Sequence, residues 1–292
     1  MTHWFKAISL YLLPHHLLSR IVQWSTRCRY FPLRKSLTRW FVGRYNVNMS
    51  EALEPDPTAY PDFNSFFTRA LRPEARPVAQ EAGQICCPVD GVISQLGDIQ
   101  DTQIFQAKSH NYSLTELLGG SETRAKPFMA GRFATMYLSP GDYHRLHMPL
   151  SGRLLETVYI PGRLFSVSPD YTESIPHLFT RNERVVCVFQ TEAGPMAVIL
   201  VGAIFVGSIE TVWAGEITPP RGKAIKVTTY EVNGDNVIQL ERGEEMGRFN
   251  MGGSTIIVLF GPDCVKWRAG LEPETSVKFG QALGSVLRPS TS

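Results

Sequence analysis

Three short segments carry the residue types that acid–base and nucleophilic chemistry requires. Asp90 lies in a Pro-Val-Asp-Gly segment, and His144 and His147 stand three residues apart between Gly141 and Pro149. Ser254 follows two glycines, and with Thr255 it directly precedes an apolar run at 256–260. A carboxylate, an imidazole and a hydroxyl together are the parts of an activated nucleophile.

Each segment also has a simpler interpretation. Asp-Gly is a common turn sequence, so Asp90 could be a turn residue without a catalytic role. The histidine pair is compatible with a structural role, a metal site or proton transfer, and no further ligand follows at metal spacing. Ser254 could mark a bulge at a strand entry, or a strained bond that its own hydroxyl attacks. Local pattern alone leaves these alternatives open.

Taken together, the segments resemble the phosphatidylserine decarboxylases. The resemblance rests on Tyr-His-Arg-x-His-Met-Pro at 143–149 and Gly-Ser-Thr at 253–255, which have the family's order and spacing. It runs from the N-terminal segment almost to the C-terminus. Further similar stretches are 107–114, 160–167, 181–184, 202–215 and 245–249.

The resemblance implies a role for each site residue. Ser254 is the nucleophile that cuts the bond after Gly253 and becomes a covalent pyruvoyl (pyruvate) cofactor. His147 is its general base, Asp90 orients that histidine, and His144 assists decarboxylation. The products are a large β chain, 1–253, and a small α chain, 254–292, held as a heterodimer, with further dimerisation left open. No metal is implied.

The resemblance also implies the reaction and its place. Phosphatidylserine is decarboxylated to phosphatidylethanolamine through a Schiff base with the pyruvoyl group, a carboxy-lyase step of phospholipid biosynthesis. The expected partner is phosphatidylserine in an anionic membrane, with no nucleic acid. The expected location is peripheral, on the cytoplasmic face of the cell membrane. His110, Arg163 and Arg184 are candidates for phosphate contact by residue type alone.

Decarboxylation of an α-amino acid explains why such a cofactor is needed. Loss of CO₂ leaves electron density on the α-carbon that no ordinary side chain absorbs, and enzymes usually borrow an electron sink. A ketone next to an amide carbonyl within the chain does the same. Serine suits its formation because the β-oxygen serves first as nucleophile and then as leaving group.

One position departs from the family pattern. The family's cleavage motif reads Leu-Gly-Ser-Thr, whereas Gly252 stands at the leucine position and the loop after Phe249 is one residue longer. This puts the strain of the loop and the rate of maturation in question. Leu283-Gly284-Ser285 keeps the leucine but lacks the threonine, so Ser254 is the predicted site.

The N-terminal segment must bring such a site to its substrate. Residues 1–50 contain no Asp or Glu but eight Lys or Arg, with three of the five tryptophans. Apolar residues recur there at helical spacing up to Trp24, and a second helix is expected over 33–45. Basic and Trp-rich helices suit the headgroup level of an anionic bilayer. The alternative is a helix that only packs on its own protein.

The rest of the chain predicts a β-rich body. A turn-rich segment at 54–57 and a short helix over 62–71 precede short apolar runs separated by Gly and Pro. Strands are expected at 91–96, 133–138, 154–159, 185–190, 196–206, 209–213, 224–230, 254–260 and 276–279. The predicted fold is α+β, with a helical membrane-association segment at 1–60 and a mainly antiparallel β catalytic domain at 61–292.

Bulk properties narrow the remaining classes. Five cysteines without a Cys-x-x-Cys pattern favour a reducing compartment, and the longest apolar run, 197–206, is too short to span a bilayer. No secretory signal and no phosphate-binding loop are expected. A serine hydrolase, a non-catalytic membrane-binding module and a zinc enzyme using His144 and His147 are the competing hypotheses. The absence of a Gly-x-Ser-x-Gly elbow counts against the hydrolase.

Overall fold

The structure is a computed structural model that describes residues 14–30, 34–107, 110–219 and 222–287. The helices are α2 (His15–Thr26), α3 (Arg34–Tyr45), α4 (Phe63–Phe67), α5 (Leu114–Leu117), α6 (Glu122–Ala125), α7 (Pro169–Thr172) and α8 (Leu178–Arg181). Single 3₁₀ turns are η1 (Met49–Glu51), η2 (Pro73–Ala75) and η3 (Lys126–Phe128).

Strands make up most of the remaining structure. In the first half they are β1 (Gln84–Cys86), β2 (Gly91–Asp98), β3 (Gln103–Ala107), β4 (His110–Ser113), β5 (Arg132–Leu138), β6 (Arg145–His147), β7 (Gly152–Ile160), β8 (Arg184–Thr191) and β9 (Gly194–Val201). The later ones are β10 (Ser208–Thr211), β11 (Gly215–Thr218), β12 (Lys226–Thr229), β13 (Gln239–Leu240), β14 (Glu245–Asn250), β15 (Ser254–Phe260), β16 (Val265–Trp267), β17 (Ser276–Val277) and β18 (Ala282–Val286).

A large antiparallel sheet forms the centre of the molecule. Its strand order is β12-β7-β8-β9-β15-β5-β2-β17, with β13 also paired to β7. Smaller sheets are β11-β10-β14-β6, β1-β18-β16 and β3-β4. All residues of β15 are buried between β9 and β5. Such a two-sided environment explains why this strand reads as one continuous apolar run.

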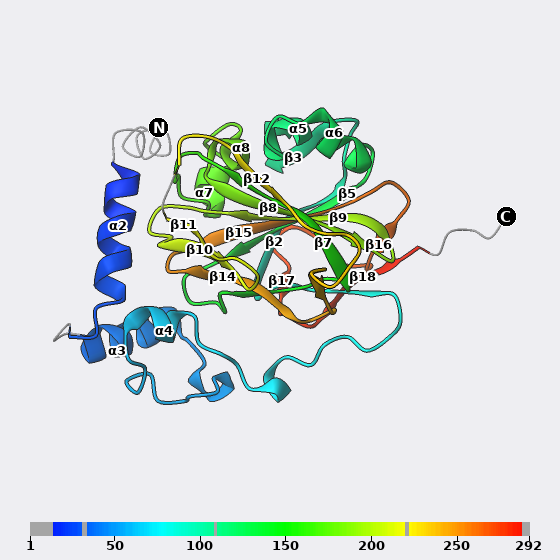
Figure 1. The fold of residues 1–292 in the computed structure, drawn as a ribbon. Coiled ribbons are helices and arrows are strands. Elements are labelled where there is room, and N and C mark those ends of the chain that lie inside the picture. The colour runs from blue at the N-terminus through cyan, green and yellow to red at the C-terminus, as the bar shows by residue number, and fades with distance from the viewer. Residues whose placement is uncertain (1–13, 31–33, 108–109, 220–221, 288–292) are drawn as a thin grey trace.

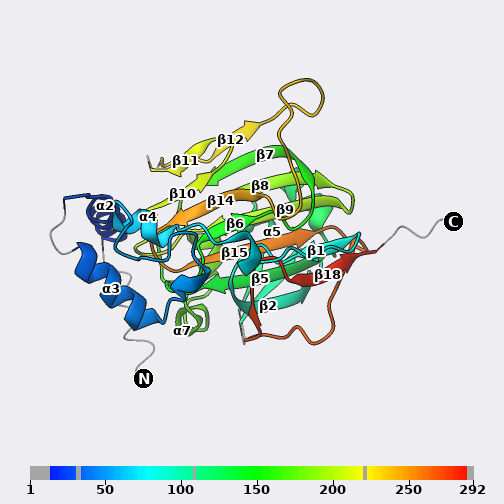
Figure 2. The same ribbon diagram turned by 90° about the horizontal axis from the view of Figure 1, so that it is seen from below.

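The N-terminal helices gather at one end of the β body. In both views α2, α3 and α4 lie together, and β18 lies toward the opposite end (Figures 1 and 2). Phe41 of α3 shares a small core with Phe63, Phe66 and Phe67 of α4. Helix α4, beyond the predicted boundary at residue 60, is thus packed against the helical segment.

The predicted fold class, α+β with a mainly antiparallel body and N-terminal helices, is confirmed. The helix expected over 33–45 is α3, and the apolar helical pattern before Trp24 is described only from Pro14 onward. The strand expected over 196–206 ends at Val201. Beyond it the backbone turns, with Val206 N–H donating to the Ala203 carbonyl and Phe205 at φ 68°.

Among the described residues, no helix combines the length and the apolar character needed to cross a bilayer.

Candidate active site

The four predicted site residues come from three parts of the β body. Asp90 directly precedes β2, His144 precedes β6, His147 ends β6, and Ser254 begins β15. Strand β6 pairs with β14, which leads through a short turn into β15. The exposed fractions of Asp90, His144, His147 and Ser254 are 7%, 0%, 7% and 0%. The site is therefore internal.

The turn before Ser254 has an unfavourable backbone conformation. Met251 and Gly252 have φ angles of 75° and 83°, in the left-handed region that non-glycine residues rarely adopt. A Cβ on Gly252 would lie 2.7 Å from the Val206 nitrogen. The turn thus requires glycine at 252 for two reasons, conformation and close approach. The leucine expected from the family would not fit this arrangement.

The Ser254 hydroxyl is buried and has no hydrogen-bond partner among the described residues. The hydroxyl of Thr255 is in the same situation. An unsatisfied buried hydroxyl costs about 1–3 kcal/mol and calls for an explanation. A role as nucleophile would supply one for Ser254, because a hydroxyl committed to another partner would be less available.

His147 is fixed on both ring nitrogens and on one face. Its Nδ1 lies 2.9 Å from the Gly243 carbonyl oxygen, so Nδ1 carries the proton and donates. Its Nε2 therefore accepts from the Tyr143 hydroxyl at 3.0 Å. The ring stacks on Phe279 at a centroid distance of 3.6 Å. Burial lowers the pKa of His147 to about 4, which leaves a neutral imidazole at pH 7.

His144 lies closer to the turn that precedes Ser254. Its Nδ1 is 2.9 Å from the Asp142 carbonyl oxygen, and its ring packs on Phe67 at a centroid distance of 4.2 Å. Burial lowers its pKa to about 3, while the backbone of Asp142 and that of Gly252 act in the opposite direction. The Nε2 of this neutral imidazole makes no hydrogen bond within the described residues.

Asp90 binds Arg76 rather than His147. Arg76 donates from Nε and Nη2 to the carboxylate at 2.5–3.1 Å, and the Phe279 N–H donates to it at 2.8 Å. Asp90 influences His147 through its charge, one of the weaker effects that raise the pKa of that histidine. The backbone N–H of His147 donates to the Pro88 carbonyl at 2.9 Å, which keeps the Asp90 segment next to β6.

The structure thus brings the predicted residues into one buried region without joining them. The direct Asp90–His147 and His147–Ser254 hydrogen bonds of a formed triad are absent: each ring nitrogen of His147 is bonded elsewhere, and Ser254 Oγ is unbonded within the described residues.

Sequence reasoning missed the residues that hold this arrangement. Arg76, Gly243 and Phe279 carry no local pattern that would have indicated them, because they reach the site from distant segments. Tyr143 lies inside the Tyr-His-Arg-x-His-Met-Pro segment, but its residue type alone indicates no role there. Arg184, a phosphate candidate, has its guanidinium bound to four backbone carbonyls, those of Glu116, Leu117, Thr180 and Asn182.

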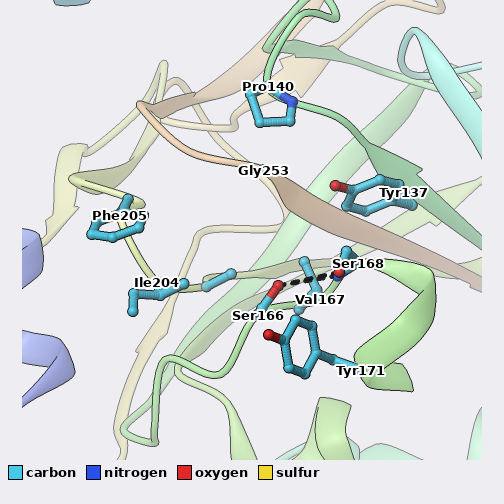
Figure 3. A pocket seen from close by; sticks show the side chains of 10 residues that line it. Tyr137, Pro140, Ser166, Val167, Ser168, Tyr171, Ile204, Phe205 and Gly253 are labelled. Carbon is cyan, nitrogen blue, oxygen red and sulfur yellow. Dashed lines mark hydrogen bonds between the residues drawn. The ribbon is translucent and has the colours of Figure 1, made fainter. Parts of the chain in front are cut away.

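A cavity of about 370 Å³ opens beside the turn (Figure 3). Gly253, Tyr137 and Pro140 lie on one side and the 166–168 segment, Tyr171 and the 203–205 segment on the other. Burial raises the pKa of Tyr137 to about 12, so its hydroxyl remains a proton donor at pH 7. A Cβ at Gly253 would lie 3.3 Å from that hydroxyl. The bond before Ser254 therefore borders a largely apolar cavity.

No cluster of three or more His, Cys, Asp or Glu side chains with metal-site geometry occurs in the described part of the chain.

The fold and site define a mixed α+β protein with a buried serine, poised after a left-handed turn and accompanied by two neutral histidines. Comparison with known proteins identifies the class more closely. The family described as "Phosphatidylserine decarboxylase" matches residues 63–285, and one described as "PSD" matches residues 5–46. This chain belongs to the phosphatidylserine decarboxylase family.

The similar curated proteins are named phosphatidylserine decarboxylase proenzyme. One from Pseudomonas putida F1 is 57% identical over 281 residues, which cover 96% of this chain and 97% of that protein. One from Pseudomonas entomophila L48 is 57% identical over 94% of this chain and 96% of that protein. One from Ectopseudomonas mendocina is 56% identical over 96% of this chain and 97% of that protein. The predicted family is confirmed.

Proposed function

We propose that this protein is a proenzyme that cuts its own chain between Gly253 and Ser254, converts Ser254 to a pyruvoyl group, and decarboxylates phosphatidylserine to phosphatidylethanolamine. The observation that carries the proposal is the buried Ser254 hydroxyl, unbonded within the described residues and preceded by two left-handed residues. The names of its relatives, phosphatidylserine decarboxylase proenzymes, support the substrate and the processing.

Self-cleavage uses atoms that the site already holds together. Ser254 Oγ attacks the Gly253 carbonyl carbon, the C–N bond breaks, and the Ser254 nitrogen takes up the proton that Oγ loses. Removal of the Ser254 α-proton then breaks the Cβ–Oγ bond, and Gly253 leaves as a carboxylate. Tautomerisation and hydrolysis replace the nitrogen by oxygen and release ammonia. No external oxidant or reductant is required.

His147 is the proposed base for the first step. Because burial keeps it neutral and Nδ1 holds its proton on Gly243, Nε2 is the atom that can receive one. To reach Ser254, Nε2 exchanges its hydrogen bond with Tyr143 for one with Oγ. Catalytic hydrogen bonds often form only along the reaction path. Asp90 supports the base through its charge. It also accepts a hydrogen bond from the backbone N–H of Phe279, whose ring stacks on His147.

His144 is the proposed residue of the decarboxylation step. Its Nε2 is unprotonated and its ring lies beside the Gly252 backbone, next to the future reaction centre. It can take the proton that a substrate ammonium group must lose before it reacts. The pyruvoyl group itself supplies a ketone for the amine and an electron sink for the carbon that loses CO₂. Tyr137 presents a protonated hydroxyl to the same cavity.

Helix α2 is the proposed membrane contact because its amphipathic pattern is inverted. Its buried residues are polar: His15, Ser19 and Thr26. Leu17, Ile21 and Trp24 share one face and are 56%, 53% and 73% exposed. An apolar outer face with basic neighbours suits an anionic bilayer surface. We therefore assign residues 1–60 to membrane association and residues 61–292 to catalysis, at the cytoplasmic face of the membrane.

Intact mass of the purified protein tests the proposed processing. The wild-type protein should give two chains, 1–253 and 254–292, with the smaller one lacking the serine nitrogen. Ser254→Ala should remain one inactive chain. Ser285→Ala, in the competing Leu-Gly-Ser segment on β18, is the matched control and should process normally. An active single chain with unmodified Ser254 would contradict the proposal.

The two histidines are distinguished by separating processing from decarboxylation. His147→Ala should block cleavage, whereas His144→Ala should yield cleaved protein with little CO₂ release per pyruvoyl group. The reverse pattern would exchange the two roles.

Vesicle flotation tests the membrane contact. A Leu17→Ser, Ile21→Ser double variant should bind phosphatidylserine-containing vesicles at least about tenfold more weakly, since each lost apolar side chain removes roughly 1 kcal/mol or more of burial. Val227→Ser, on the exposed strand β12, is the control and should bind like wild type. Equal binding by both variants would contradict docking through α2.

A further inference from the structure

Asn250, the last residue of β14, is a buried hub of hydrogen bonds. It is 2% exposed, and its Nδ2 donates to Ser208 Oγ at 2.7 Å and to Glu210 Oε2 at 3.1 Å. Its Oδ1 accepts from Asn64 Nδ2 at 3.0 Å. Its carbonyl oxygen accepts from the Gly207 N–H at 2.6 Å. One side chain thus joins α4, β10 and β14.

The position of this hub matters because Asn250 directly precedes the two left-handed residues. On the other side of the turn, Ser254 is held in the sheet opposite Leu138. The turn is therefore anchored at both ends, and it has only residues 251–253 in which to relax. A strained backbone persists only where its surroundings hold it.

The same hub is connected to the N-terminal helix. Arg27, the residue that caps the C-terminus of α2, donates from Nη2 to Ser208 Oγ at 3.2 Å. The Glu216 carboxylate binds Arg27 and also accepts from Ser208 Oγ at 3.0 Å. Farther along α2, Ser19 Oγ accepts from the Phe205 N–H at 3.3 Å. Helix α2 thus lies against the 205–208 segment, which borders both the turn and the cavity.

We propose that Asn250 is a positioning residue for self-cleavage, and that Arg27 supports it through Ser208. Asn250 holds the start of the turn so that the Gly253 carbonyl stays within reach of Ser254 Oγ. Through Arg27, correct docking of α2 on the β body favours the cleavage geometry. The inference rests on the proposed self-cleavage and assigns to it a residue that does not touch the reacting atoms.

Cell-free synthesis of the full chain, in detergent micelles, gives the rate of conversion to two chains. Asn250→Leu keeps the side-chain size but removes every side-chain hydrogen bond, and should slow conversion about tenfold or more. Arg27→Gln should slow it about threefold, because it removes the guanidinium contacts with Ser208 and Glu216 at the edge of the network. Gln106→Met is the matched control. Gln106 is also a buried amide with three hydrogen bonds, to Thr172, Ile175 and Leu178, none of which belongs to the hub.

Two further readouts distinguish positioning from a general loss of structure. Once matured, the Asn250 variant should decarboxylate at the wild-type rate per pyruvoyl group. Hydroxylamine, which cleaves an accumulated ester, should not accelerate chain cleavage if the attack itself is slowed. Rescue by hydroxylamine, equal slowing of Asn250→Leu and Gln106→Met, or wild-type conversion by Asn250→Leu would each overturn the inference. A wild-type chain that never cleaves would instead refute the proposed function.

Discussion

At the scale of single residues, burial decides what the two histidines can do. His144 and His147 are both enclosed, and desolvation disfavours the imidazolium form of each. In each ring Nδ1 faces a backbone carbonyl, so the same tautomer results and Nε2 keeps its lone pair. Both residues are therefore neutral at pH 7, with an unprotonated Nε2.

This burial predicts acid sensitivity. The folded-state pKa values, about 3 for His144 and about 4 for His147, lie below the usual 6.5, so unfolding takes up protons between those values. Stability should be fully present above pH 6.5 and fall as the pH drops toward 4, by up to about 1.4 kcal/mol per pH unit for each histidine.

Denaturant unfolding at pH 7, 6 and 5 measures this slope. To keep every protein in one chain, the comparison uses Ser254→Ala with and without His147→Gln. The His147 variant should show a shallower pH dependence. An identical slope in the two proteins would argue against a buried neutral histidine at 147.

The Asp90–Arg76 pair makes a second residue-scale prediction. Asp90→Asn removes a buried negative charge from Arg76, which keeps only Glu51 as an ionic partner among the described residues. We expect a loss of about 1–3 kcal/mol in the free energy of unfolding, together with slower processing. Asp98→Asn breaks the exposed pair with Arg132 and should change stability by less than about 0.5 kcal/mol. Thermal unfolding and gel assays measure both, and equal effects would contradict the prediction.

At the scale of elements, the turn between β14 and β15 connects the fold to the chemistry. Strand β14 belongs to the four-stranded sheet and β15 to the large one, so the turn must change sheets within residues 251–253. That short connection explains the two left-handed residues and the close approach to Val206.

Gly252→Ala tests the importance of this turn. A Cβ there would meet Val206 N at 2.7 Å in addition to the cost of a left-handed alanine, so self-cleavage should slow by about tenfold or more. Gly215→Ala is the control, because Gly215 also has a positive φ, 68°, but nothing lies within 4 Å of its Cβ position. Gly252→Leu should be slower still, although it restores the family's residue. Faster processing by either Gly252 variant would contradict the observed turn.

At the scale of the whole molecule, the proposed cut lies at the start of a strand that is buried along its whole length. All seven residues of β15 are buried, and β15 pairs with β9 on one side and β5 on the other. The small fragment also supplies β17 to the large sheet and β16 and β18 to the sheet with β1. The proposed cleavage before Ser254 would therefore sever one bond and leave the small fragment's strand pairings in place.

We accordingly expect the two chains to remain associated. Size-exclusion chromatography without denaturant should give one particle containing both chains, while a denaturing gel separates them. Release of the 254–292 fragment under native conditions would contradict this expectation. The uncleaved Ser254→Ala protein is the size reference.

The sequence predicts those structural features that depend on neighbouring residues better than those that depend on distant ones. Long apolar runs such as 254–260 and 185–190 were placed correctly, because burial on both faces leaves a continuous signal. Short strands such as β6 and β14 were not predicted, since their few residues are mixed in polarity and only their partners define them. Cleavage and the individual site roles stay predictions.

The sequence by itself determined the family and the α+β class, because ordered motifs and hydrophobic periodicity are properties of neighbouring residues, and it singled out Ser254 as the predicted cleavage site. Only the tertiary structure decided that Asp90 binds Arg76, that His147 bonds Tyr143 and Gly243, and that Asn250 holds the turn. These contacts join segments up to 186 positions apart, as for Asn64 and Asn250. Hydrogen-bond partners depend on distances of a few tenths of an ångström, which folding sets and linear spacing does not.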